Sequence, residues 1–541
     1  MHFTRPSISS GLLCVLTAIY FLLFTNKTFW PLIFDYFNGQ PLKVAVMAVA
    51  LLLLHIAILV LFSAHYVIKP FLIFMIMVAA AGSYFAETFG TIITRNVVEA
   101  TLTTTAGESR NLLTAGFITH MLLYGLLPSA LIAWVRVIHR PILNKIMINT
   151  PIILGCVAGF VILIGADFGA YSSMYRMHRH DIMGYLVPYK PVASTIDYFI
   201  RDLTERQIVM QPLGQDAKQV QMTLPAGKKM LTVVVVGETA RAQNFSLNGY
   251  ERETNPELKK RDVLAFTNTT SCGTETSVSV PCMFSPFPRT DYSSAKFKAS
   301  ENLLDVLQHA GVNVEWWENN TGDKGVADRS KMIDLQTSND PKYCAGGECI
   351  DQILSDYLRD HLAEFEENTT LVLHMTGSHG PAYYMRYPPE IAQFKPECRT
   401  AEFSKCEDSQ IVNSYDNSIL YTDKVLSQII DILKDNEDKF VSSMIYMSDH
   451  GESLGENGLY LHAAPYFIAP DTQTHIPFIA WFSPDYQAVT GMDLSCLRAS
   501  SGEEASHDNL FHTVLGMMNV KTSVYDQSLD RFAACRKQAE P

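Results

Sequence analysis

Five apolar stretches in the first 170 residues constrain the fold of this 541-residue chain more than any other feature. Each approaches the ~20 residues that a helix needs to cross a lipid bilayer. Charged residues are sparse within them. The first third of the chain is therefore predicted to be a membrane domain of five helices. The stretches are Ser10–Phe24, Val44–Ala64, Phe71–Phe89, Phe117–Val135 and Pro151–Ala170.

The first of these stretches is the shortest, and Phe29, Trp30 and Phe34 extend it with an aromatic belt. A cleaved signal peptide is the alternative interpretation. No small-x-small cleavage site follows Phe24, however, and four more apolar stretches come after it. We therefore expect this segment to remain in the mature protein as the first span.

Basic residues in the short connecting segments predict the orientation of the membrane domain. With five spans, Arg5, Lys69, Arg136, Arg140 and Lys145 all fall on one side of the bilayer. Short loops rich in Lys and Arg stay on the cytoplasmic side. Everything after residue 170 is then predicted to lie on the opposite side of the membrane.

The charge distribution separates a slightly basic first part of the chain from an acidic second part. Residues 1–200 carry 12 Lys and Arg against 7 Asp and Glu, whereas the remainder carries 30 against 48. An acidic soluble part argues against a protein that binds duplex nucleic acid, which needs cations to contact phosphates. We predict a transmembrane domain over 1–170, an interfacial amphipathic linker over 171–214 and an extracytoplasmic domain over 215–541.

The cysteines agree with this topology. Cys14 and Cys156 fall inside predicted spans, and the other eight fall in the soluble domain. An even number on the oxidising side of a membrane predicts disulfides. A thiolate metal site is the alternative, but the sequence has no Cys-x-x-Cys pair. Proximity in sequence suggests the pairs Cys272–Cys282, Cys344–Cys349 and Cys398–Cys406, which leaves Cys496–Cys535 as the fourth pair.

Short apolar runs rich in β-branched residues predict buried parallel strands at Met230–Val236, Thr369–Leu373 and Ser443–Met447. Val312–Trp317 is a further candidate strand. Helical patterns lie between the runs, for example at Asn302–Ala310 and Ile411–Leu433. Such alternation predicts an α/β domain with a mostly parallel sheet, in which ligands bind beyond the carboxyl ends of the strands.

Polar residues follow each of the three runs. Glu238 follows the first, His374 and His379 follow the second, and Asp449 and His450 follow the third. A single polar residue at a strand end is usually a turn former or a cap. Three such ends at one edge of a sheet instead indicate a site, and carboxylate with imidazole ligands suits Zn²⁺ or Mn²⁺. His462, in a nearby glycine-rich loop, is a further candidate, and His374 is expected to be structural.

A segment crowded with hydroxyl groups, residues 269–282, supplies candidate nucleophiles. It reads as a turn entering a helix, where free backbone N–H groups can hold an anion. A metal ion can turn a coordinated hydroxyl into a usable nucleophile. Helix capping is the alternative role for these side chains. Spacing alone leaves Thr270, Thr274 and Thr276 equally eligible.

The motifs together resemble the lipid A phosphoethanolamine transferases, a family that includes the mobile colistin-resistance enzymes. The resemblance covers nearly the whole chain and includes the five spans. It implies an alkaline phosphatase/sulfatase-like α/β domain in the periplasm, attached to a five-helix transmembrane domain. The motifs are Gly237-Glu238-Thr239-Ala240-Arg241, Ser271-Cys272-Gly273-Thr274-x-Thr276, Pro281-Cys282-Met283-Phe284-Ser285, Gly377-Ser378-His379-Gly380-Pro381 and Ser448-Asp449-His450-Gly451-Glu452-Ser453-Leu454-Gly455-Glu456.

The resemblance also implies roles for individual residues. The threonine that is covalently modified in the family corresponds to Thr276, so the resemblance selects Thr276 among the three candidate threonines. One zinc ion is tightly bound, and a second is allowed during turnover. The family usually has an Asn where this chain has Ala100. The implied zinc ligands are Glu238, Thr276, Asp449 and His450; the implied phosphate- or second-zinc-binding residues are His379 and His462; and the implied substrate-pocket and lipid-binding residues are Asn320, Lys324, Thr104 and Glu108.

The reaction that the resemblance implies has two steps. Thr276 attacks the phosphorus of phosphatidylethanolamine and diacylglycerol leaves, and a lipid A phosphate then takes the phosphoethanolamine group. The surface loses negative charge, which implies resistance to polymyxins such as colistin. The enzyme is expected to be a multi-pass monomer in the inner membrane of a Gram-negative bacterium, surrounded by membrane lipids and without a nucleic acid partner.

Two other classes of protein fit the sequence less well. A related membrane-anchored phosphotransferase, sulfatase or phosphodiesterase would act on another glycan or cell-wall acceptor. A sulfatase uses a modified Cys or Ser, whereas the candidate nucleophile here is Thr276. A membrane-anchored binding module on an inactive phosphatase fold would be expected to lose a ligand or the nucleophile, and every one is present.

Overall fold

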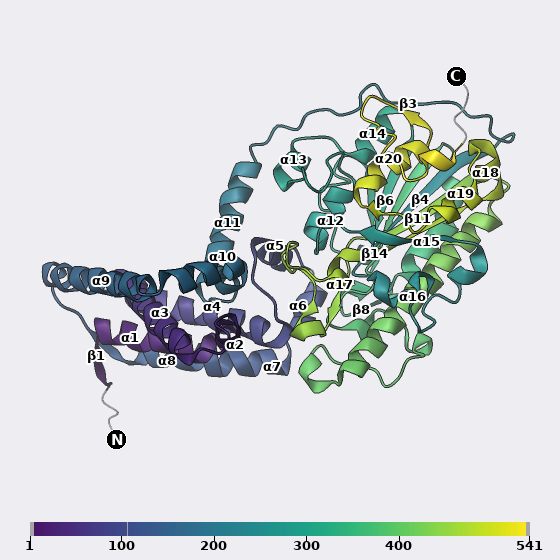
Figure 1. The fold of residues 1–541 in the computed structure, drawn as a ribbon. Helices are drawn as coiled ribbons and strands as arrows, with labels where there is room; N and C mark the ends of the chain where they lie inside the picture. Colours follow the sequence, from purple (N-terminus) through teal and green to yellow (C-terminus); the bar gives the residue numbers. More distant parts are fainter. Residues whose placement is uncertain (1–4, 105, 537–541) are drawn as a thin grey trace. The chain divides into compact units, whose positions relative to one another are not determined.

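A computed structural model describes residues 5–104 and 106–536, and the chain divides into two compact units. The first unit comprises Met1–Val98 and Leu113–Phe199. The second comprises Glu99–Leu112 and Ile200–Pro541. Figure 1 traces the elements of both units along the chain.

The first unit is a bundle of apolar helices. Within the described residues, four helical segments are long and apolar enough to cross a membrane, and a bent pair makes a fifth. This agrees with the five expected spans, although the last helix begins nine residues earlier than the apolar stretch that predicted it. The segments are α1 with its π-helical end (Ser10–Thr25) and α2 (Phe29–Tyr36), α3 (Pro41–Leu61), α4 (Ile68–Phe89), α7 to α8 (Ala115–Trp134) and α9 (Ile142–Gly165).

The first span is bent by 78° between Thr25 and Phe29. Asn26 lies at the bend and is fully buried. Its side-chain amide donates to the carbonyl of Phe21 at 3.0 Å and to that of Val187 at 2.8 Å. A break in a helix frees backbone carbonyls that lipid cannot satisfy. The amide of Asn26 supplies the missing donor, so the bend is stable in an apolar environment.

Two helices, α10 (Phe168–Gly184) and α11 (Tyr189–Glu205), occupy the region expected to be a linker. The second has an amphipathic pattern, because Ile196, Phe199, Ile200 and Leu203 are all exposed and recur at helical spacing. Such an exposed apolar stripe is the feature that favours a helix lying at a membrane surface.

The second unit is built on an eight-stranded sheet, visible as the fan of arrows in Figure 1. Its central strands β11, β4, β10 and β6 are parallel, as the apolar runs predict, whereas β14 runs antiparallel to both of its neighbours. The strand order is β15 (Ala505–Ser506), β5 (Leu264–Thr270), β14 (His475–Phe482), β11 (Phe440–Ser448), β4 (Lys229–Gly237), β10 (Thr369–His374), β6 (Asn313–Glu318) and β7 (Lys331–Asp334).

Both faces of the central strands are buried, so helices must cover the sheet on both sides. Helices α12 (Thr276–Met283), α14 (Leu303–His309) and α20 (Asp508–Met517) share one large core with the face that carries Val234 and Val372. Helices α15 (Gln352–His361) and α16 (Asp408–Asp435), which pack on each other, contribute nothing to that core and cover the opposite face.

All four expected disulfides are present in the second unit, and Cys14 and Cys156 are free. None of the four bridges links strands of the eight-stranded sheet. Cys272–Cys282 ties the end of β5 to α12, and Cys344–Cys349 closes a hairpin of β8 (Cys344–Ala345) and β9 (Glu348–Cys349). Both of these loops border the carboxyl edge of the sheet.

Candidate active site at the carboxyl edge of the sheet

The predicted edge of the sheet brings the candidate ligands together. Glu238 directly follows β4, and Asp449 and His450 directly follow β11, the neighbouring parallel strand. One ligand atom from each of the three lies within 4.8 Å of the others, and all three residues are fully buried. The cluster therefore lies where open α/β sheets bind ligands, beyond the carboxyl ends of adjacent strands.

The backbone around Glu238 is held in an unusual conformation. Thr239 has a φ of 58°, in the left-handed region that a β-branched residue rarely adopts. This turn lets its N–H donate to Oδ1 of Asp449 at 3.1 Å. Gly377 approaches from the loop after β10, where a Cβ atom would lie 2.4 Å from the carbonyl oxygen of Glu238. The strand end is thus fixed from both sides.

The protonation state of His450 indicates what the cluster can bind. Nδ1 of His450 lies 2.9 Å from the carbonyl of Gly451, so it carries the ring proton. Burial and the nearby His462 lower the pKa of His450 to about 3, which keeps the ring neutral. Nε2 therefore presents a lone pair. It lies 3.3 Å from Oδ2 of Asp449 and 3.5 Å from Oε1 of Glu238, two further electron-rich atoms.

These contacts fit a bound cation. Oδ2 of Asp449 is buried and has no hydrogen-bond donor among the residues that the structure describes. Burial and the neighbouring Glu238 raise the pKa of Asp449 well above its usual value. Two buried carboxylates this close repel each other unless a proton or a metal cation lies between them, and the lone pair of His450 faces both. The donor set of oxygen and nitrogen atoms is one that Zn²⁺ accepts.

Thr276, the first residue of α12, is the hydroxyl that meets this cluster. Its Oγ1 donates to Oε2 of Glu238 at 3.0 Å and lies 3.5 Å from Nε2 of His450. Thr270 and Thr274 are turned elsewhere, with their hydroxyls donating to the carbonyls of Ala505 and Ala464. Thr276 is also only half buried, so an incoming substrate can approach it.

Asn320 supports Glu238 from the loop after β6. Its amide nitrogen donates to Oε2 of Glu238 at 2.8 Å and to the carbonyl of Met375 at 2.8 Å. The loop itself is fixed by Glu318, whose carboxylate accepts from the N–H of Asn320 and from Nδ1 of His374 at 2.9 Å. His374 is fully buried and faces Glu318, which agrees with the structural role expected for it.

His462 and His379 complete the ring of functional groups. The ring of His462 lies 4.5 Å from that of His450 and 5.5 Å from that of His379, measured between centroids. Nδ1 of His462 lies 2.8 Å from Oε2 of the fully buried Glu452. Burial lowers the pKa of His462, but Glu452, Glu238 and Asp449 outweigh it and raise that pKa to about 9. The ring is then a cation at neutral pH.

The remaining expected residues are Lys324, Thr104 and Glu108. The ammonium group of Lys324 donates to Thr321 in the same loop as Asn320. Thr104 lies between α5 (Arg95–Thr103) and α6 (Ala106–Leu112). The side chain of Glu108 lies outside the described part of the structure.

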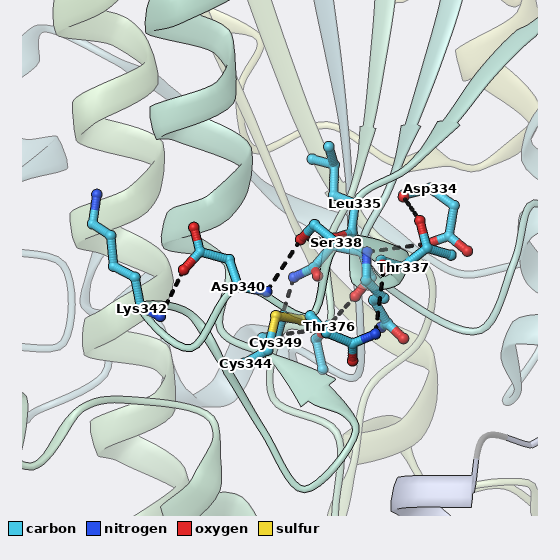
Figure 2. Close-up of a disulfide and its surroundings, with 12 residues drawn as sticks. Asp334, Leu335, Thr337, Ser338, Asp340, Lys342, Cys344, Cys349 and Thr376 are labelled. Atoms are coloured by element: carbon cyan, nitrogen blue, oxygen red, sulfur yellow. Dashed lines mark hydrogen bonds between the residues drawn. A yellow bond between two sulfur atoms is a disulfide. The ribbon is translucent and has the colours of Figure 1, made fainter.

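The disulfide hairpin of β8 and β9 braces two of the active-site loops (Figure 2). The carbonyl of Cys349 accepts from the side chain of Asn319 at 3.1 Å and from the hydroxyl of Thr376 at 3.4 Å. Asn319 precedes Asn320, and Thr376 follows His374 by two residues. The bridge Cys344–Cys349 therefore stabilises the loops that carry Asn320 and His379.

A buried ion pair continues from the same hairpin. Glu348 in β9 accepts from Arg386 at 3.1 Å, and Nε of Arg386 donates to the carbonyl of His379 at 2.8 Å. The other oxygen of Glu348 accepts from Asn111 in α6 at 3.3 Å. A Cβ at Gly107 would lie 2.9 Å from Cγ of Glu348, so the backbone of α6 packs closely on the hairpin. Arg386 thereby fixes the backbone that carries His379.

Sequence reasoning missed three of these supporting residues, Glu318, Arg386 and Glu348, and assigned no role to Glu452. Glu452 belongs to a motif that was recognised, three residues after Asp449, so its position in the sequence was a usable signal. Glu318 ends an apolar strand, as Glu238 follows one. No local pattern marks Arg386 or Glu348, because their partners are distant in the sequence.

Comparison with known families covers both units. A family model described as "Phosphoethanolamine transferase EptA/EptB" matches residues 51–203. A family model described as "Sulfatase" matches residues 231–520. The two matches thus divide near the boundary between the helical bundle and the α/β unit.

Individual relatives match over nearly their full length. The chain is 37% identical to phosphoethanolamine transferase EptA of Escherichia coli (strain K12), covering 99% of both chains. It is 34% identical to phosphatidylethanolamine transferase Mcr-1 of Escherichia coli, covering 98% of both. Among solved structures, the integral membrane lipooligosaccharide phosphoethanolamine transferase A of Neisseria meningitidis is 36% identical. It matches with a TM-score of 0.94 and covers 98% of this chain and 100% of that one.

Proposed function

The chain belongs to the lipid A phosphoethanolamine transferase family, and from that premise we propose that it moves phosphoethanolamine from phosphatidylethanolamine to a phosphate group of lipid A. It is an inner-membrane protein with its catalytic domain in the periplasm. Both proposed substrates are lipids, so a membrane anchor keeps the α/β unit at the surface where they occur.

The contact between Thr276 and Glu238 carries this proposal. The half-buried hydroxyl donates to Oε2 of Glu238 at 3.0 Å, at the mouth of a cluster that is otherwise buried. In this position the proton of Thr276 is directed toward a carboxylate. A lone pair of Oγ1 remains available for an electrophile that arrives from solvent.

Glu238, Asp449, His450 and Thr276 are the residues that would hold a zinc ion. When bound, zinc lowers the pKa of a coordinated hydroxyl and stabilises negative charge on phosphoryl oxygens. Because the two carboxylates and the imidazole are fully buried, they are shielded from exchange with water. The hydrogen bonds from Thr239 and Asn320 keep Asp449 and Glu238 in the required orientation.

In the first step, Oγ1 of Thr276 forms a bond to the phosphorus of phosphatidylethanolamine. The bond from phosphorus to the glycerol oxygen breaks, and diacylglycerol leaves after taking up a proton. Oε2 of Glu238 accepts the proton of Thr276 as the glycerol oxygen takes one up, so no proton is gained or lost overall. The imidazolium of His462, held by Glu452, attracts the anionic phosphoryl oxygens, and His379 faces the same space.

In the second step, a lipid A phosphate oxygen attacks the phosphorus of the phosphoethanolamine on Thr276. The bond between phosphorus and Oγ1 breaks, and the hydroxyl of Thr276 regains its proton. The imidazolium of His462 stabilises both steps, because the negative charge on the phosphoryl oxygens is similar in each transition state. Lys324 is the further cation that we assign to substrate binding, and Thr104 and Glu108 are assigned to the lipid.

The product has less negative charge than the acceptor. A phosphate monoester carries about −1.5 to −2 at neutral pH. Esterification leaves about one negative charge on each phosphorus and adds an ammonium group, so the membrane surface becomes less anionic. Polycationic antibiotics are attracted to that surface by opposite charge, so we propose that the activity confers resistance to polymyxins.

Mass spectrometry of lipid A from cells with and without the protein tests the proposal. Wild-type protein should add one phosphoethanolamine, and Thr276→Ala should add none. Thr270→Ala is the matched control, because Thr270 lies in the same hydroxyl-rich segment but bonds to Ala505. Intact-protein mass spectrometry should detect a phosphoethanolamine adduct on wild-type and Thr270→Ala protein after incubation with donor alone. Lipid A that stays unmodified while labelled phosphoethanolamine enters another glycan would reassign the acceptor.

A further inference from the structure

The membrane unit contains a cationic cavity that the transfer reaction does not use. It has a volume of about 400 Å³ and lies at the end of the bundle where α3 ends, α4 begins and α8 ends. This is the end that the basic loops assign to the cytoplasm. The lining residues are Arg5, His65, Lys69, Val135, Arg136, Val137 and His139.

The walls of this cavity are ordered by backbone contacts. Strand β1 (Ser7–Ser9) pairs in parallel with β2 (Arg136–Ile138), and the N–H of Arg136 donates to the carbonyl of Pro6 at 2.9 Å. The ammonium group of Lys69 donates to the carbonyls of Ala133 and Val135 at 2.8 and 2.6 Å. Lys69 therefore caps the carboxyl end of α8, and its charge is partly satisfied there.

Arg5 and Arg136 differ from Lys69, whose charge is partly neutralised by backbone carbonyls. Neither guanidinium group has a hydrogen-bond or ion-pair partner among the residues that the structure describes. The sequence has no Asp or Glu in residues 1–34, 36–86 or 109–166, so the segments that form this end of the bundle offer no carboxylate. Two unpaired guanidinium groups facing one cavity favour an anion with several oxygen acceptors.

Exposed apolar residues in the segments that form this end of the bundle indicate which anion is favoured. Tyr66 is 86% exposed and Ile138 is 55% exposed, and Trp134 and Leu61 are also exposed. In a bilayer these apolar side chains contact acyl chains just below the headgroup region. A ligand that pairs with the two arginines and also contacts these apolar side chains has an anionic head and apolar tails.

We propose that this cavity binds the headgroup of an anionic phospholipid of the cytoplasmic leaflet, with Arg5 and Arg136 contacting its phosphodiester. Basic pockets between membrane helices on the cytoplasmic side bind such headgroups in other proteins. A bound lipid would tie the N-terminal segment to the loop after α8, because Arg5 and Arg136 belong to the two paired strands.

Native mass spectrometry of the full-length protein in detergent tests this inference, with dioleoyl phosphatidylglycerol and dioleoyl phosphatidylcholine as probes. Wild-type protein should retain phosphatidylglycerol in preference to phosphatidylcholine. The double variant Arg5→Gln/Arg136→Gln should bind phosphatidylglycerol about 25-fold more weakly, given the contribution expected of each basic residue near a membrane surface. Arg136→Lys should keep part of the affinity.

Arg140→Gln is the matched control, since Arg140 is exposed on the same side but does not line the cavity. It should change the affinity by less than about twofold. An equal loss in Arg140→Gln would mean that only the diffuse positive field matters and would overturn the site. Equal retention of the two lipids would overturn it as well. Glycerophosphoglycerol binding as tightly as phosphatidylglycerol would show a site for a soluble anion instead. None of these results depends on the transfer reaction.

Discussion

Nε2 of His450 lies 3.3 Å from Oδ2 of Asp449, and when Asp449 is ionised neither atom has a proton to share. Such a contact between two acceptors is unfavourable in a buried site. It becomes favourable when a cation binds both atoms. Replacing Asp449 should therefore change zinc binding and the stability of the metal-free protein in opposite directions.

Asp449→Asn should abolish transfer and weaken zinc binding by at least about 10–100-fold, the loss that even outer contacts of a metal site produce. In chelator-treated protein the same variant should be more stable than wild type by about 1–3 kcal/mol, because it removes a buried, unsatisfied acceptor. Thermal unfolding with and without zinc measures both effects. Zinc that still stabilises Asp449→Asn as much as wild type would exclude Asp449 as a ligand.

Thr276→Ala should lower the transfer rate on the order of 10³-fold or more, because it removes the nucleophile. Cells that produce this variant should be as susceptible to polymyxin as cells without the protein, at equal protein abundance. Thr270→Ala cells should stay resistant. Resistance in the Thr276→Ala strain, or resistance with unmodified lipid A, would contradict both the nucleophile and the proposed physiological role.

Arg386 should act on the reaction through His379. Arg386→Met leaves the buried Glu348 without its cation, and we expect a loss of about 3–5 kcal/mol in the free energy of unfolding. Adding Glu348→Met should recover most of that loss. The double variant Arg386→Met/Glu348→Met should still have a reduced kcat, because it lacks the hydrogen bond from Arg386 to the carbonyl of His379.

The ion pair of the exposed Arg359 with the buried Asp356 provides the control for this cycle, because Asp356 keeps Lys342 as a second cation when Arg359 is replaced. Arg359→Met should cost no more than about 1 kcal/mol and leave kcat unchanged. A double variant with normal stability and normal kcat would show that Arg386 has a structural role alone.

Cys272–Cys282 and Cys398–Cys406 close loops of similar length, with sequence separations of 10 and 8. Replacing either pair by Ala should cost a similar 2–3 kcal/mol, roughly the loop entropy that such a bridge removes from the unfolded state. Only the first pair should lower kcat, because its loop contains Thr276. Equal activity of the two variants would show that the bridge does not position the nucleophile. Alkylation of unreduced, denatured wild-type protein should label Cys14 and Cys156 alone.

The Glu452–His462 pair should give the metal-free protein a pH-dependent stability. The folded pKa of His462 is raised to about 9, above the ~6.5 of an unperturbed histidine. The stabilisation is therefore complete below about pH 6.5 and is lost as the pH rises through about 9. In Glu452→Gln the loss of stability over this range should shrink. Thermal unfolding of chelator-treated protein measures it, and identical pH profiles for variant and wild type would refute the pairing.

Local sequence patterns were sufficient to predict much of this fold. The apolar stretches predicted the spans because a helix in lipid must be apolar over its length. The uninterrupted runs Met230–Val236 and Ser443–Met447 predicted central strands because both of their faces are buried. Glu238, Asp449 and His450 could then be assigned to one edge, since parallel strands end together.

Strand β14 was not predictable in the same way. It contains Pro477, which normally argues against a central strand because it cannot donate to the ladder. The structure places Pro477 at an irregularity in the pairing with β5, between Ile476 and Phe478, where the ladder is interrupted. The antiparallel direction of β14 also depends on the path of the chain between distant segments, which no local pattern records.

The sequence by itself thus determined which segments cross the membrane, which strands form the centre of the sheet and which strand ends carry the candidate ligands, because each follows from burial of a contiguous stretch. Spacing within residues 269–282 left three threonines open; the family resemblance selected Thr276, and the tertiary structure shows its hydroxyl meeting Glu238. Only the tertiary structure decided that Glu318 fixes His374 and that Arg386 fixes the backbone of His379. Those contacts join residues up to tens of positions apart, and their geometry depends on how the loops pack against one another after the sheet has formed.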